Sequence, residues 1–232
     1  MNIKDVRETV KKLRNKEKAK LLQRYFKTGP GEYAEGDIFY GITVPALRAL
    51  AGKFKDLELK DTIALLKSPV HEERFLALII LMARYRRSDI AGKKNIYRIY
   101  LNNTRYINNW DLVDVTAKRI VGDFLSDKDK APLYKLARST SVWERRIALL
   151  STLHFIDNGL FGDTLKIARM LLSDEHDLIH KAAGWMLREV GKRDMAVEED
   201  FLKKHSKKMP RTMLRYAIEK FPENKRRAYL GL

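Results

Sequence analysis

The feature that most constrains this chain is a repeated pattern in which a small alanine sits inside an apolar helical segment. The pattern recurs at intervals of 31 to 40 residues, with anchors at Ala77, Ala117, Ala148, Ala183 and Ala217. That period fits a two-helix repeat of the HEAT or armadillo kind, whose units bury their apolar faces by stacking on their neighbours. The sequence therefore predicts an all-α fold, a right-handed α-solenoid of HEAT/armadillo-like repeats.

The rest of the chain agrees with a helical organisation. Alternating β-branched runs are weak, and 6 Pro and 12 Gly leave few breaks. We expect about a dozen helices joined by short loops, within a single domain over residues 1–232. One irregular segment, roughly residues 28–42, interrupts the pattern.

The charge balance indicates a polyanionic partner. The chain carries 47 Lys+Arg against 30 Asp+Glu, a formal charge of +17, which favours nucleic acid or anionic lipid. A solenoid curves, and basic side chains on its inner helices would make a concave basic groove. The candidates on the repeat helices are Arg74, Lys118, Arg119, Arg145, Arg146, Lys181, Arg188, Arg211 and Arg215. For any single one of them, a solvated helix face is the simpler interpretation.

Other classes are disfavoured by composition. Cysteine is absent, which excludes disulfides, Cys-ligated zinc and a thiol nucleophile. No run of about 18 apolar residues is present, and the N-terminal stretch has no apolar core of the secretory kind. We expect an intracellular, cytoplasmic protein that has no membrane partner.

The stretch NNWDLVD, residues 108–114, is the most suggestive local motif. Trp110 and Asp114 are four residues apart at the start of an expected helix, so both project from one face. An aromatic plane beside a carboxylate could hold a cation. Spacing alone equally allows an ion pair between Asp114 and Lys118, and a helix N-terminal capping role for Asp111.

Two further tryptophans are each followed, three residues later, by an arginine on the same helix face. These pairs are Trp143 with Arg146 and Trp185 with Arg188. Gly184 beside Trp185 lowers helix propensity, which suggests a close approach of backbones there. The stretch HDLIH, residues 176–180, superficially mimics a zinc motif, but no third ligand stands out and we expect no metal.

Taken together, these segments resemble the AlkD-like DNA glycosylases, which are built from HEAT-like repeats. The resemblance runs through LLQRYFKTGPGEY, YGITVPALRALA, NNWDLVD, SVWERRIALL, HKAAGWMLREVG and MPRTMLRYAIEKFP. It implies a monofunctional enzyme that hydrolyses the N-glycosidic bond of cationic N3- or N7-alkylated purines in double-stranded DNA. It also implies no cofactor, a monomer, and association with the nucleoid when bound to DNA.

Carried over by motif, the resemblance assigns a role to each of six residues. It implies a catalytic carboxylate at Asp114, lesion-flanking aromatic residues at Trp110, Trp185 and Tyr25, and DNA-backbone contacts at Arg146 and Arg188.

Two alternatives stay open at the level of sequence. A non-catalytic HEAT-like module that binds nucleic acid or an acidic protein explains the charge and the repeats equally well. A glycosylase-lyase would use a lysine amine as a Schiff-base nucleophile, although no lysine is singled out.

Overall fold

The computed structural model describes residues 2–231, and every regular element in that range is a helix. The sole β-type pairing there is an isolated parallel bridge between Ile38 and Val70. The predicted all-α fold class is therefore confirmed. Several helices begin at a side chain that accepts a hydrogen bond from a free backbone N–H of the first turn, namely Asn2, Asn15, Asp89, Ser141 and Asp194.

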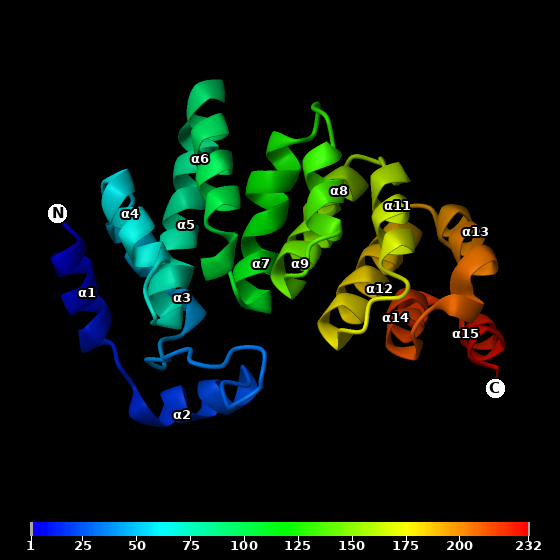
Figure 1. Cartoon of the computed structure of the whole chain (residues 1–232), viewed down its shortest axis with the longest axis horizontal. Helices are drawn as coiled ribbons and strands as arrows, with labels where there is room; N and C mark the ends of the chain where they lie inside the picture. Colours follow the sequence, from blue (N-terminus) through cyan, green and yellow to red (C-terminus); the bar gives the residue numbers. More distant parts are fainter. Residues whose placement is uncertain (1, 232) are drawn as a thin grey trace. The chain divides into compact units, whose positions relative to one another are not determined.

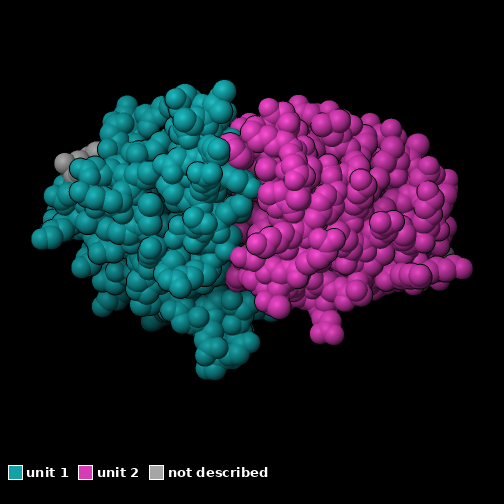
Figure 2. Space-filling view, turned by 45° about the horizontal axis from the view of Figure 1, so that its top comes forward, with its two compact units in different colours: residues 1–116 teal, residues 117–232 magenta. Residues whose placement is uncertain are grey.

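The chain divides into two compact units, Met1–Thr116 and Ala117–Leu232, coloured separately in Figure 2. The boundary passes through the C-terminal end of α7. A single domain over residues 1–232 stays a prediction.

The first unit is built around one long apolar helix. Its helices are α1 (Ile3–Lys12), α2 (Lys16–Tyr25), α3 (Val44–Lys53), α4 (Leu59–Leu66), α5 (His71–Arg87), α6 (Ile90–Asn102), a 3-10 turn (Thr104–Tyr106) and α7 (Trp110–Ala117) (Figure 1). Helix α5 packs against α3, α4 and α6. Its first eleven residues are all buried, so α5 forms the core on which the others rest.

The second unit centres on α12. Its elements are a π-helical turn (Lys118–Gly122), α8 (Ala131–Ala137), α9 (Val142–Ser151), α10 (Leu153–Asp157), α11 (Gly162–Met170), α12 (Asp177–Gly191), α13 (Met195–His205), a 3-10 turn (Ser206–Lys208), α14 (Arg211–Ala217), a 3-10 turn (Ile218–Lys220) and α15 (Glu223–Leu230) (Figure 1). Helix α12 packs against α9, α13 and α14, and its buried face supplies much of this core.

The alanine anchors behave as the repeat pattern predicts. All five lie on helices α5, α7, α9, α12 and α14 and are completely buried, at 0% exposure. Gly184 of α12 also fulfils its predicted role, because a Cβ there would lie 2.4 Å from the carbonyl oxygen of Met213 on α14. The absence of a side chain at Gly184 thus allows α12 and α14 to approach closely at this point.

None of the helices within residues 2–231 combines the length and the apolar character needed to cross a membrane.

Candidate functional site

Helix α7 presents the two residues of the NNWDLVD motif as expected. It begins at Trp110, and Asp114 follows one turn later; both side chains are half-buried. Asp114 also lies near buried Tyr100, whose hydroxyl is 2.9 Å from Thr116 Oγ1. Burial raises the pKa of Tyr100, and the negative charge of Asp114 raises it further. The carboxylate is thus held at the edge of the core of the first unit.

A cluster of packed rings holds Trp110 in place. The indole stacks on Phe26 with ring centroids 5.0 Å apart, and Phe26 stacks on Phe39 at the same distance. Phe39 in turn stacks on the imidazole of His71 at 4.5 Å. The indole N–H donates to the Tyr33 hydroxyl at 3.3 Å. Packed rings and a hydrogen bond together fix the orientation of this tryptophan.

Tyr25, the last residue of α2, meets Trp110 in this unit. Their rings pack edge to face with centroids 5.8 Å apart, and Tyr25 remains 65% exposed. The structure therefore brings together two of the three predicted lesion-flanking aromatic residues. Both present polarisable ring surface next to the helix that carries Asp114.

The start of α5 carries four consecutive charged or titratable residues, His71, Glu72, Glu73 and Arg74, which we call the HEER cluster. All four are 2–3% exposed, and each has a partner from another segment. Glu73 accepts from Arg7 at 3.3 Å. Burial of so many charges is tolerated because each one is paired or hydrogen-bonded.

His71 joins α7 to the irregular segment 28–42. Its Nε2 lies 2.8 Å from Asp111 Oδ2 and its Nδ1 lies 3.5 Å from Asp37 Oδ2, while Arg74 donates to Asp37 at 2.6 Å. Burial acts to lower the pKa of His71, but the charges and hydrogen bonds of Asp111 and Asp37 outweigh it and raise the pKa. Asp111 also accepts from the Leu112 N–H at 2.8 Å, so it holds the start of α7 from two sides.

Glu72 holds the end of the same irregular segment. Its carboxylate accepts hydrogen bonds of 2.7–3.2 Å from the backbone N–H groups of Tyr40, Gly41 and Ile42. Gly41 has φ +81°, and a Cβ there would lie 2.2 Å from the carbonyl oxygen of Asn15. Only glycine fits this turn, which fastens segment 28–42 against α2 and α5.

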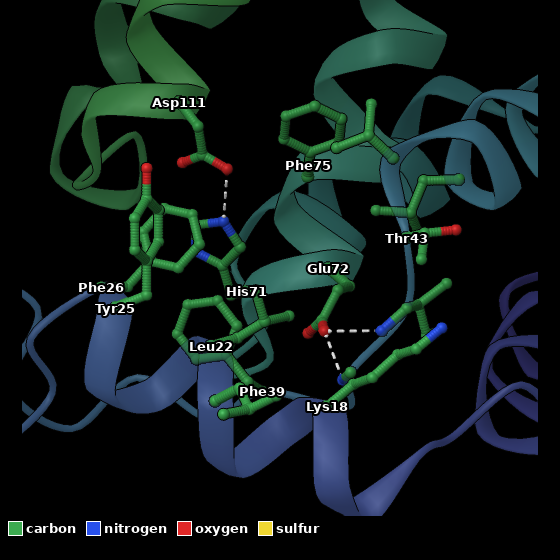
Figure 3. Close-up of a pocket in the computed structure, with 15 residues that line it drawn as sticks. Lys18, Leu22, Tyr25, Phe26, Phe39, Thr43, His71, Glu72, Phe75 and Asp111 are labelled. Atoms are coloured by element: carbon green, nitrogen blue, oxygen red, sulfur yellow. Dashed lines mark hydrogen bonds and ion pairs between the residues drawn. The ribbon is translucent and has the colours of Figure 1, made fainter.

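A cavity of about 310 Å³ opens beside the HEER cluster, entirely within the first unit. Its wall is mostly apolar, with aromatic rings from Tyr25, Phe26, Phe39 and Phe75. Figure 3 shows Asp111 and Phe75 on one side of this space and the α2 residues Lys18 and Leu22 on the other.

The second unit holds the remaining predicted aromatic residue. Trp185 on α12 is half-buried, and its indole N–H donates to Glu189 at 3.2 Å. Arg188 on the same helix forms an ion pair with Glu219 and lies 3.7 Å from Glu189. Both side chains are therefore oriented by acidic residues.

Arg146 lies deeper than a typical phosphate ligand. It is 5% exposed, and its guanidinium donates to the carbonyl oxygen of Leu178 at 2.6 Å, at the start of α12. Several of the basic residues predicted to line a groove form ion pairs within their own unit. These pairs are Arg74–Asp37, Lys118–Asp157, Arg145–Asp174, Lys181–Asp177 and Arg188–Glu219.

The two histidines of HDLIH have structural partners. His176 caps α12 by accepting from the Leu178 N–H at 3.2 Å, and His180 contacts the Asp174 carbonyl oxygen. Within residues 2–231 no three His, Asp or Glu side chains gather in a way that could hold a metal ion.

Sequence reasoning missed the residues that support Trp110, namely Phe26, Tyr33, Asp37 and His71. A signal was available in the HEER cluster, because these four consecutive polar residues lead directly into an apolar run, residues 75–81, of the same helix. Where such residues are buried, they need partners. Their main partners, however, lie 30 or more residues away in the sequence.

The model of a family described as DNA alkylation repair enzyme matches residues 6–221. A predicted DNA alkylation repair enzyme from Enterococcus faecalis has a similar fold, with TM-score 0.69 and 18% identity over 90% of this chain and 97% of that one. The protein smu.31 from Streptococcus mutans UA159 has TM-score 0.53 and 19% identity over 95% of this chain and 99% of that one. No curated protein matches the chain.

Proposed function

The chain belongs to the family of DNA alkylation repair enzymes, and from that premise we propose that it is a monofunctional DNA glycosylase. Its substrates are cationic N3- and N7-alkylated purines in double-stranded DNA. The observation that carries the proposal is that α7 holds, four residues apart, a half-buried carboxylate, Asp114, and an indole, Trp110, oriented by packed rings and a hydrogen bond.

The chemistry requires few groups. An alkylated purine of this kind already bears a positive charge, so it leaves without being protonated. When its bond to C1′ breaks, the electron pair of that bond goes to the ring nitrogen and the base departs neutral. A water molecule adds its oxygen to C1′. The protein must stabilise the positive charge that develops on the sugar and accept a proton from this water.

In this mechanism Asp114 faces the sugar, stabilises its positive charge and takes the proton of the water. Trp110 and Tyr25 offer aromatic surface to the cationic base, worth about 0.5–2 kcal/mol per contact depending on desolvation. Trp185 is proposed as a third aromatic contact from the second unit.

The formal charge of +17 supports binding of the DNA backbone. Arg188 and Arg146 are the proposed phosphate contacts. The acidic partners of Arg188 hold its guanidinium in one orientation, and phosphate oxygens would compete with Glu219 for it. Arg146 is 5% exposed and its guanidinium donates to the Leu178 carbonyl, so we expect it to contribute less to DNA binding than Arg188 does.

The direct test is incubation of the protein with methylated duplex DNA. We expect release of free 3-methyladenine and 7-methylguanine, detected by chromatography, with one abasic site formed for each base. Unmethylated duplex of the same sequence is the control and should release no base.

Two other outcomes would redirect the assignment. Binding of methylated DNA without base release would make the chain a non-catalytic nucleic-acid module. Strand cleavage coupled to base release, with a borohydride-trapped covalent adduct, would indicate a lysine-dependent lyase.

A further inference from the structure

The cavity beside α5 is lined by neither Trp110 nor Asp114, but two residues of its wall contact Trp110. Trp110 stacks on one side of Phe26, and Phe26 is itself part of the cavity wall. Tyr25 contacts Trp110 and also lines the cavity. Asp111, the residue after Trp110, forms part of the wall near the start of α7.

The two carboxylates that line the cavity already have hydrogen-bond or ion-pair partners within the protein. Asp111 is paired with His71, and the Glu72 carboxylate is occupied by three backbone N–H groups. Lys18 is exposed to solvent. The cavity therefore offers mostly apolar surface with no free carboxylate to pair with a buried cation, so the desolvation cost of an ion works against a charged ligand there.

The aromatic wall of the cavity favours a flat ligand. Four aromatic residues, Tyr25, Phe26, Phe39 and Phe75, contribute to a space of about 310 Å³. This volume lies at the lower end of the roughly 300–1,000 Å³ typical of small-molecule sites. A heterocycle of one or two fused rings fits that size, and the Thr43 hydroxyl and the free lone pairs of Asp111 can meet its polar edge.

We propose that this cavity receives the neutral methylated purine base after its release from DNA. The inference rests on the proposed function, because glycosidic cleavage converts a cationic base into a neutral one. On cleavage the base loses its positive charge and with it the cation–aromatic attraction, whereas the gain from burying its ring surface in the adjoining cavity does not depend on charge. Tyr25 contacts Trp110 and also lines the cavity, so it connects the proposed lesion site with the cavity.

Binding of the free base is measured without any DNA, by saturation-transfer NMR and calorimetry with 3-methyladenine as the probe. We expect saturable binding of one molecule per chain. The cationic nucleoside 7-methylguanosine should bind at least about tenfold more weakly, since tenfold corresponds to about 1.4 kcal/mol. Tighter binding of the cation than of the neutral base would overturn the proposal.

A substitution that fills the cavity tests whether 3-methyladenine binds there. Val44, the first residue of α3, lines the cavity and is 40% exposed, so an indole placed there can occupy the space from its open side. Val44→Trp should weaken binding of 3-methyladenine at least about tenfold. Ile90→Trp is the matched control, because Ile90 is the first residue of α6, is 80% exposed and does not line the cavity. Thermal unfolding verifies that both variants are folded.

The result separates this inference from the proposed function. Base release from methylated DNA without detectable binding of 3-methyladenine would overturn the inference and leave the glycosylase assignment standing. Binding that Val44→Trp and Ile90→Trp leave equally strong would also overturn it, because the ligand would then lie elsewhere. Binding that Val44→Trp abolishes, in a chain that releases no base, would support the cavity and contradict the glycosylase assignment.

Discussion

The imidazole of His71 and the carboxylate of Asp111 lie 2.8 Å apart, which ties the start of α5 to the start of α7. Asp111 directly follows Trp110, so this buried ion pair also determines where the indole stands. On its other side His71 faces Asp37, which brings the irregular segment 28–42 into the same arrangement. The support of the candidate site is thus a chain of contacts among three segments that are distant in sequence.

Replacing Asp114 by Asn tests the catalytic role. We expect Asp114→Asn to fold and to bind duplex DNA, because the amide has the size of the carboxylate. Its rate of 7-methylguanine release should fall by at least about a hundredfold, since the charge that stabilises the sugar cation is gone. Asp56→Asn, at an exposed acid of the same unit, is the control and should keep the wild-type rate. Normal base release by Asp114→Asn would remove Asp114 from the mechanism.

Arg146→Ala is expected to have two separable effects. It should lower stability by about 1–3 kcal/mol, because the partly buried carbonyl of Leu178 loses the hydrogen bond from the guanidinium. It should also weaken binding to damaged and undamaged DNA alike and reduce the salt slope by about 0.9, the value for one lost phosphate contact. Fluorescence anisotropy at several salt concentrations, below the unfolding temperature of the variant, measures the second effect. An unchanged salt slope would restrict Arg146 to packing.

The His71 pair makes stability depend on pH. Because the folded state raises the pKa of His71, its contribution is fully present below about pH 6.5, the unfolded value. The contribution is lost as the pH rises through the raised pKa. We expect the free energy of unfolding to fall over that window in the wild type and not in His71→Gln. That variant should be about 3–5 kcal/mol less stable at low pH. Urea unfolding across the pH range is the measurement, with His154→Gln as the control.

The burial of Glu198 in the second unit predicts a further dependence of stability on pH. This residue is 1% exposed; burial raises its pKa to about 8, with Glu199 adding to the rise and Arg188 opposing it. The folded state thus favours the protonated form, and stability should decrease between the ordinary glutamate pKa and about pH 8. Glu198→Gln is expected to remove this decrease and to be the more stable protein at pH 8. Glu175→Gln, at an exposed position, should reproduce the wild-type curve.

Local spacing predicts where α7 begins but not which distant residues it contacts. The start of the helix at Trp110 and the placement of Asp114 one turn later follow from local spacing, and both were predictable. The hydrogen bond of Asp111 to the Leu112 N–H is likewise local. The ion pair of Asp111 with His71 was not predictable, because it joins residues that are 40 positions apart. The periodicity of α5 and α7 does not indicate that Asp111 pairs with His71.

By itself the sequence determined the helical class, the repeat anchors and the face that Trp110 shares with Asp114, because helix geometry is set by residues three and four apart. Their surroundings depend on tertiary packing. Packing places Phe26, at the end of α2, and Tyr33, from segment 28–42, against the indole, and it pairs the buried charges of the HEER cluster. The physical reason is that a buried charge requires a partner, but packing between distant segments selects which one.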